Sequence, residues 1–199
     1  GEAFSAPASA AKPQLNETDE ITLIEFGSSR YDYQHNGSMA KMIAVSGDGV
    51  AHLAFMGGQN TSDLRRVQAA CITPDGTVSG PLDTVNYRTG YTTVATTSGS
   101  PANGMAANST VVGWHGAPVS DLISVFAVDF GGCWMAFNTL NGARAEWIWP
   151  HVALDYQDRG HVTSSDSTTG ADEDNVYYNS TDNGMAWNGE FVTVTTNSN

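Results

Sequence analysis

Three short segments of the chain each place an arginine close to aromatic residues. They are Arg30–His35, Tyr87–Tyr91 and Arg144–Trp149. Aromatic faces stack on sugar rings, and a guanidinium group binds a carboxylate through two parallel hydrogen bonds. The residues that predict such a site for an acidic glycan are Arg30, Tyr33, Arg88, Tyr91, Arg144, Glu146, Trp147 and Trp149. The alternative interpretation gives these aromatic residues a packing role and the arginines local ion pairs.

A second group of side chains suits a hard cation. The acidic segment 166–174 supplies several carboxylates within a short span, and oxygen ligands are those that calcium prefers. The candidate ligands are Asp166, Asp172 and Asp174. The segment lacks the spacing of an EF-hand, so a solvated acidic loop is the alternative. No other cofactor is expected, and His52, His115 and His161 are expected to have structural roles.

The composition indicates how these residues are positioned. Charged residues make up only 15% of the chain and glycines number 21, which is typical of many short strands joined by turns. The net charge of −13, with only eight Lys and Arg, argues against a nucleic-acid partner. No run of eighteen apolar residues is present, so no membrane span is expected. The sequence therefore predicts an all-β protein.

The first nineteen residues differ from the rest of the chain. Segment 1–19 is rich in Ala, Ser and Pro, which is typical of an extended segment that follows a removed export signal. Acceptor motifs for N-glycosylation occur at Asn16, Asn36, Asn60 and Asn108. Together these features predict a secreted or cell-surface protein that is glycosylated.

A motif recurs at a nearly constant spacing. Its clearest copy is Ser180-x-Asp182-x-Gly184-x-x-Trp187, and a weaker copy retains Asp129 and Trp134. A third position matches in outline, because a strand ends there in Asp75-Gly76. The three aspartates are 54 and 53 residues apart. This regularity predicts a repeated structural unit.

Each repeat contains four short segments with the pattern of β-strands. They predict three four-stranded antiparallel blades, at about 39–86, 91–140 and 149–196, within a domain of residues 20–199. Apolar alternation at Ile21–Phe26 predicts one further, orphan strand in front of them. Cys71 and Cys133 are expected either to remain as two buried free thiols or to form one bridge between neighbouring blades.

The box at 180–187 resembles the Asp box of BNR-repeat, sialidase-like β-propellers, and the resemblance covers roughly residues 39–196. It implies a propeller in which Ser180, Asp182, Gly184 and Trp187 stabilise the turn between the third and fourth strands. Closed propellers have about four to eight blades. Three blades are therefore expected to belong to a longer parent chain or to a ring completed by self-association.

The resemblance leaves two functions open. A sialidase needs three converging arginines, a tyrosine nucleophile with a glutamate partner and an acid/base aspartate. The Arg-Ile-Pro motif that carries the first arginine of such enzymes is absent, because Arg30 is followed by Tyr31 and Asp32. A secreted, non-enzymatic module that binds a glycan or protein, or builds a surface assembly, is therefore preferred. The alternative is the N-terminal portion of a sialidase-type glycoside hydrolase.

Overall fold

The computed structural model describes residues 22–31, 34, 41–58, 64–97, 109–118, 121–129, 133, 135–145, 147–167, 175–179 and 192–194. Every regular element in this part of the chain is a β-strand. The expected all-β class is therefore confirmed. Segment 1–19 and the box residues Trp134, Ser180, Asp182, Gly184 and Trp187 lie outside the described residues.

Three four-stranded antiparallel sheets follow one another along the chain. The first sheet contains β1 (Ile43–Val45), β2 (Ala51–Gly57), β3 (Arg66–Ile72) and β4 (Val78–Asp83). The second contains β5 (Thr89–Thr96), β6 (Thr110–Gly116), β7 (Ile123–Asp129) and β8 (Phe137–Ala145). The third contains β9 (Trp147–Leu154), β10 (Gly160–Asp166), β11 (Asn175–Asn179) and β12 (Val192–Val194). Each sheet corresponds to one predicted group of four strands, and sequential neighbours pair throughout.

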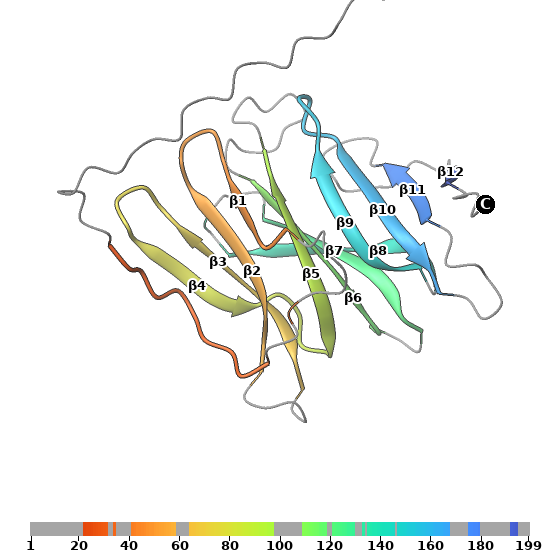
Figure 1. Ribbon diagram of the computed structural model, residues 1–199, viewed down its shortest axis with the longest axis horizontal. Coiled ribbons are helices and arrows are strands. Elements are labelled where there is room, and N and C mark those ends of the chain that lie inside the picture. Colours follow the sequence, from red (N-terminus) through yellow and green to blue (C-terminus); the bar gives the residue numbers. More distant parts are fainter. Residues whose placement is uncertain are drawn as a thin grey trace, which may run out of the picture.

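The sheets stack in chain order, and the first strand of each sheet packs across the face of the preceding sheet (Figure 1). β5 lies against β1, β2 and β3, whereas β9 lies against β5, β6 and β7. The second sheet is therefore covered on both faces, and every residue of β6 and β7 is buried. The apolar side chains between the first and second sheets include Met56, Val67, Val94 and Trp114. Those between the second and third include Phe126, Trp147, Val152 and Val162.

Three hairpin turns share one geometry, and Figure 1 shows them at the same end of the sheets. They are Ser46–Val50, Thr73–Thr77 and Asp155–Arg159, and each is closed by two backbone hydrogen bonds of 2.8–3.1 Å. The fourth residue of each turn has a left-handed backbone, with φ of 85° at Gly49, 86° at Gly76 and 58° at Asp158. Glycine adopts this conformation without steric cost, which explains two of the three choices.

The aspartates of the repeated motif do not all occupy the same place. Asp75 lies inside a hairpin turn, where its carboxylate accepts the Thr77 N–H at 3.1 Å. Asp129 is the last residue of β7, is buried, and accepts the Met135 N–H at 2.8 Å. Both carboxylates stabilise the connection between a third and a fourth strand. Their spacing of 54 residues nevertheless does not mark structurally equivalent positions.

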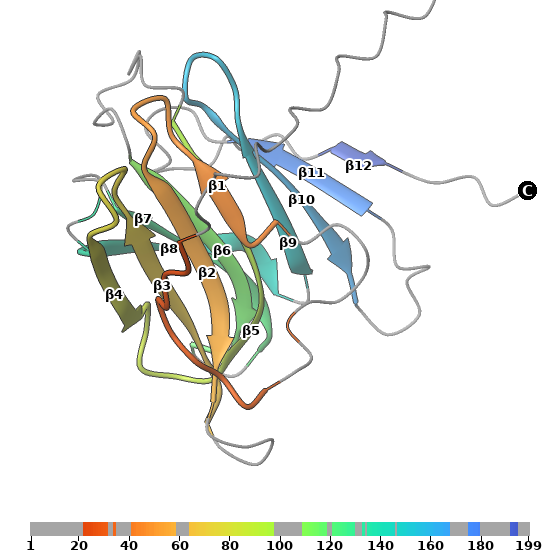
Figure 2. The same ribbon diagram turned by 60° about the vertical axis from the view of Figure 1, so that its left-hand side comes forward.

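The prediction of an orphan strand at Ile21–Phe26 is wrong for the described residues 22–26, which form no strand. Residues 22–30 form no ladder and run over the outer face of the first sheet (Figure 2). The Phe26 ring lies edge-on against Phe55, with 5.5 Å between ring centroids, and the Ser29 hydroxyl donates to the Met56 carbonyl at 2.6 Å. Phe26 thus packs on the sheet without a strand partner, whereas Leu23 of the same alternating segment is exposed, a distinction that periodicity cannot make.

A disulfide joins Cys71 of β3 to Cys133 in the connection between β7 and β8. The two Cα atoms are 5.8 Å apart, within the normal range for a bridged pair. The bridge crosses from the first sheet to the second. Of the two alternatives for the cysteines, the structure contains the bridge, which joins neighbouring sheets.

Candidate functional site

The first strands of the second and third sheets are interrupted at equivalent positions. The register of β5 with β6 shifts between Gly90 and Thr93, and that of β9 with β10 shifts between Ile148 and His151. Tyr91 and Trp149 lie at these interruptions, and each has a left-handed backbone with φ of 52°. Such a conformation is unfavourable for bulky residues and clusters at functional sites. The same irregularity therefore occurs twice at this end of the sheets.

These two interruptions bring aromatic rings to His115 at the end of β6. The Tyr91 ring meets the imidazole edge-on, with 4.9 Å between ring centroids. The Trp149 ring lies at 6.4 Å from the same imidazole, tilted by 48°. Residues from the second and third sheets therefore converge on one histidine.

Arg65, just before β3, links the first sheet to this cluster. Its guanidinium carbon lies 5.0 Å from the Tyr31 ring centroid and 5.4 Å from that of Tyr91, within the range of cation–π attraction. Its Nε donates to the Thr89 carbonyl at 3.2 Å, and its Nη1 also donates to the Tyr31 hydroxyl. At Gly90 a Cβ atom would come within 3.0 Å of this guanidinium. The glycine therefore leaves the space in which Arg65 lies.

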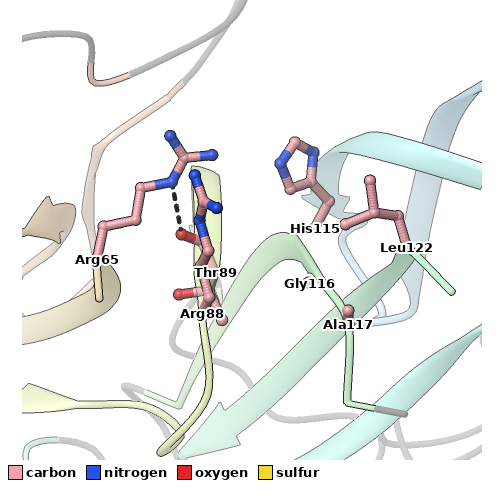
Figure 3. Close-up of a pocket in the computed structure, with 7 residues that line it drawn as sticks. All are labelled: Arg65, Arg88, Thr89, His115, Gly116, Ala117 and Leu122. Atoms are coloured by element: carbon pink, nitrogen blue, oxygen red, sulfur yellow. Dashed lines mark hydrogen bonds between the residues drawn. The ribbon is translucent and has the colours of Figure 1, made fainter. Parts of the chain in front are cut away.

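A cavity of about 340 Å³ opens beside this cluster. Its lining residues are Arg65, Arg88, Thr89, His115, Gly116, Ala117 and Leu122. Figure 3 shows the guanidinium groups of Arg65 and Arg88 on one side of the hollow, with His115 and Leu122 on the other. The cavity thus has a cationic wall opposite a wall that is largely apolar.

His115 is neutral at physiological pH because of its surroundings. Burial, together with the positive charges of Arg65 and Arg88, lowers the pKa of His115 from 6.5 to about 4. Its Nδ1 is buried and has no hydrogen-bond partner among the described residues. A buried nitrogen without a partner is energetically costly.

The arginines of the described chain divide into two kinds. Arg66 forms an ion pair with Asp83 at 3.0 Å, and Arg159 pairs with Asp155 at 2.7 Å. Within the described residues, Arg65 and Arg88 have no carboxylate at ion-pair distance. Both guanidinium groups line the cavity, and an anion there could pair with them.

The predicted ligand-binding residues separate into three groups. Arg88 lines the cavity, while Tyr91 and Trp149 flank its histidine. Arg30 is exposed beside Gly58, to which its N–H donates at 2.9 Å, and Trp147 is buried between the second and third sheets. The remaining predictions fall outside what is described, namely Tyr33, Glu146 and the side chain of Arg144.

Sequence reasoning missed Tyr31, Arg65 and His115 as parts of the site. Arg65 follows the second strand, in the connection that reaches the same end of the sheet as the crossover between sheets. Its position could therefore have indicated a place in the site. The adjacent Arg66 has the same position in the sequence pattern but forms an ion pair with Asp83, so position alone does not distinguish the two arginines. His115 carried no spacing signal, because its partners come from three separate segments.

The other predicted groups remain untested or have structural roles. No cluster of metal-ligating side chains occurs within the described ranges; Asp166 accepts the Trp147 indole N–H at 3.3 Å, and Asp172 and Asp174 lie outside those ranges. His52 is buried between sheets and its Nδ1 lies 2.5 Å from the Thr110 hydroxyl, while His161 lies 3.2 Å from Asp155. The glycosylation motifs also lie outside the described residues, at Asn16, Asn36, Asn60 and Asn108.

Comparison with known proteins adds no family assignment. No family model matches the chain, and no curated protein is significantly similar to it. In the described part, no helix is long and apolar enough to cross a membrane. The Asp-box resemblance therefore stays a prediction based on the motif alone.

Proposed function

We propose that this chain is a secreted, non-enzymatic β-propeller module that binds an acidic glycan in the cavity between Arg65, Arg88 and His115. The observation that carries the proposal is the pair of arginines without carboxylate partners in the described residues, next to a histidine with an unpaired buried nitrogen. A carboxylate or sulfate group on a sugar would pair with both guanidinium groups.

The apolar wall of the cavity supports a sugar rather than a bare anion. Ala117 and Leu122 line the cavity together with the two arginines, and Tyr91 and Trp149 hold His115 in place without lining the cavity themselves. Sugar rings have apolar faces that pack on apolar side chains, while their acidic groups pair with arginine. The cavity of about 340 Å³ falls at the small end of ligand sites, which suits one or two sugar units.

The propeller and the location in the cell are parts of the same proposal. Three stacked sheets, each with its first strand against the preceding sheet, have the arrangement of consecutive blades. The Cys71–Cys133 disulfide favours an oxidising compartment and so supports export, because such bonds are rare in reducing cytosol. A calcium requirement through Asp166 remains a weaker proposal.

Titration with matched sugars tests the proposal. Sialyllactose and lactose differ by one acidic sugar, and a glucuronic-acid disaccharide adds a second acid type. We expect the acidic sugars to quench tryptophan fluorescence through Trp149 and to bind more weakly as salt is raised, whereas lactose has little effect. Release of free sialic acid during the titration would instead support the sialidase alternative.

Two arginine variants provide the decisive comparison. Arg88→Gln removes an exposed guanidinium from the cavity, and Arg66→Gln removes the same charge from an ion pair with Asp83. We expect Arg88→Gln to weaken binding of the acidic sugar about tenfold or more, since a charge-assisted hydrogen bond contributes about 1.5–3 kcal/mol. Arg66→Gln should change it little. Equal effects of the two variants, or no binding of any acidic sugar, would overturn the proposal.

A further inference from the structure

The first strands of the three sheets share a short sequence and a common pairing. Ile43-Ala44-Val45, Val94-Ala95-Thr96 and Val152-Ala153-Leu154 each place an alanine after a β-branched residue. Ile43 pairs with Leu53, Val94 with Val112 and Val152 with Val162. The three β-branched residues are therefore structurally equivalent, and the three alanines form a second equivalent set on the opposite faces of their sheets.

The two interfaces inside the chain use these sets in the same way. Ala44 of the first sheet shares an apolar layer with Val94 of the second. Ala95 of the second sheet shares the next layer with Val152 of the third. At both interfaces, the alanine of one sheet and the valine of the next sheet belong to the same apolar layer.

At the two ends of the stack this pairing is incomplete. Among the described residues, the β-branched residue of the first sheet has no alanine opposite it, and the alanine of the third sheet has no β-branched residue opposite it. Ile43 is 52% exposed on the outer face of the first sheet, although Val94 and Val152 are buried. Ala153 is exposed on the outer face of the third sheet, although Ala44 and Ala95 are buried. A hollow of about 190 Å³ lies around Ala153, and the residues that line it include His151, His161 and Thr163.

The segment before β1 covers only part of the first outer face. Phe26 packs against Phe55 of β2, but Ile43 and Val45 of β1 remain exposed beside a groove of about 410 Å³. β1 corresponds to β5 and β9, the strands that make the two internal interfaces. The exposed strand β1 is thus the equivalent of the strands that pack on the preceding sheet at the two internal interfaces.

We infer that β1 of one copy docks on the outer face of the third sheet of a second copy, with Ile43 entering the hollow around Ala153. This contact would continue the internal interfaces with the same two residue positions. It joins two different patches of the chain, so it repeats from copy to copy until a ring closes; in a ring of two copies it occurs twice, related by a two-fold axis. Two copies bring together six sheets, twice the three of one chain, which lies within the about four to eight blades of closed propellers.

Sedimentation analysis of the intact chain over a range of concentrations tests this association. We expect wild-type protein to reach the mass of two chains. Ile43→Arg and Ala153→Arg each place a charge in the proposed contact, and each should weaken association about thirtyfold or more, the effect typical of a central interface residue. Leu82→Arg is the matched control, because Leu82 is 50% exposed on β4, away from the proposed contact.

Mixing the two interface variants distinguishes the head-to-tail contact from other arrangements. In a mixed pair, the unchanged Ile43 of one copy meets the unchanged Ala153 of the other, so the mixture should regain a dimer that neither variant forms alone. This recovery also shows that both variants are folded, and far-UV circular dichroism provides an independent check.

Several outcomes would overturn the inference. Wild-type protein that stays monomeric at all concentrations would leave the face of β1 to a different occupant, such as a further sheet of a longer chain. An Ile43→Arg variant that associates like Leu82→Arg would exclude β1 from the contact. Loss of association in Ile43→Arg but not in Ala153→Arg would indicate a face-to-face dimer through β1 alone.

Discussion

Removing the disulfide between the first and second sheets should cost a large part of the stability of the fold. The bridge joins Cys71 and Cys133, which are separated by 62 residues. In the chain-entropy description of cross-links, a closed loop of that length destabilises the unfolded chain by about 4 kcal/mol at 25 °C. Cys71 is fully buried and its thiol would remain a small apolar group after reduction, so little packing is lost. The expected effect is therefore close to the loop-closure value.

Urea unfolding monitored by tryptophan fluorescence measures this effect. With a slope of about 2 kcal/mol per molar urea, a loss of about 4 kcal/mol lowers the midpoint by about 2 M. Oxidised wild type is compared with reduced wild type and with the Cys71→Ala/Cys133→Ala variant. Reduction and double substitution should lower the midpoint by similar amounts, because both act through the same cross-link.

A control separates the bridge from local effects of substitution. Adding reductant should have no effect on the double variant, which has no cysteines left. The reasoning is refuted if unfolded, unreduced wild type contains two reactive thiols, or if the reduced and oxidised proteins share one midpoint. A midpoint that falls only in the double variant would show that packing at Cys71 matters and the cross-link does not.

Two further predictions concern acid stability and backbone strain. Burial lowers the pKa of His52 from 6.5 to about 4, with Asp48 opposing the shift, so the unfolded chain binds the proton first. The contribution of neutral His52 to the free energy of unfolding is complete above pH 6.5, and about 3 kcal/mol of it is lost as the pH falls to 4. The urea midpoint of His52→Asn should therefore depend less on pH in that interval than the midpoint of wild type. At Tyr91, where φ is 52°, glycine should be more stable than alanine by about 1 kcal/mol in thermal unfolding. The regular strand position Gln68 should show the opposite order.

The sequence was sufficient to predict the strands because each one alternates or is continuously apolar over a short span. The run Ile-Ser-Val-Phe-Ala-Val of β7 is apolar apart from Ser124, and the structure buries that strand on both faces. Turn residues such as Asp75-Gly76 marked where strands end. Ile21–Phe26 has the same alternation, yet its described residues 22–26 form no strand, because pairing depends on a neighbouring strand that a local pattern does not contain.

The candidate site was predictable only in part. The sequence pointed to Arg88, Tyr91 and Trp149 because each belongs to a short segment that places an arginine close to aromatic residues. Arg65 and His115 belong to the site through contacts across sheets, and these depend on the stacking order and on the breaks in register. Such breaks leave no periodic trace in the sequence, since they change the direction of one side chain without changing the residues around it.

Each first strand serves two purposes along its length. In β5, Val94 and Ala95 enter the apolar layers on either side of the second sheet, while Tyr91 at the break in register turns toward Arg65 and His115. β9 repeats this division with Val152 in the layer and Trp149 at the site. Because of the break in register, side chains in the second half of the strand alternate between the two faces of the sheet, whereas those in the first half do not. The stacking that holds the sheets together therefore also fixes the distance between the aromatic residues of the site, so the proposed glycan contacts depend on packing at residues that no ligand would touch.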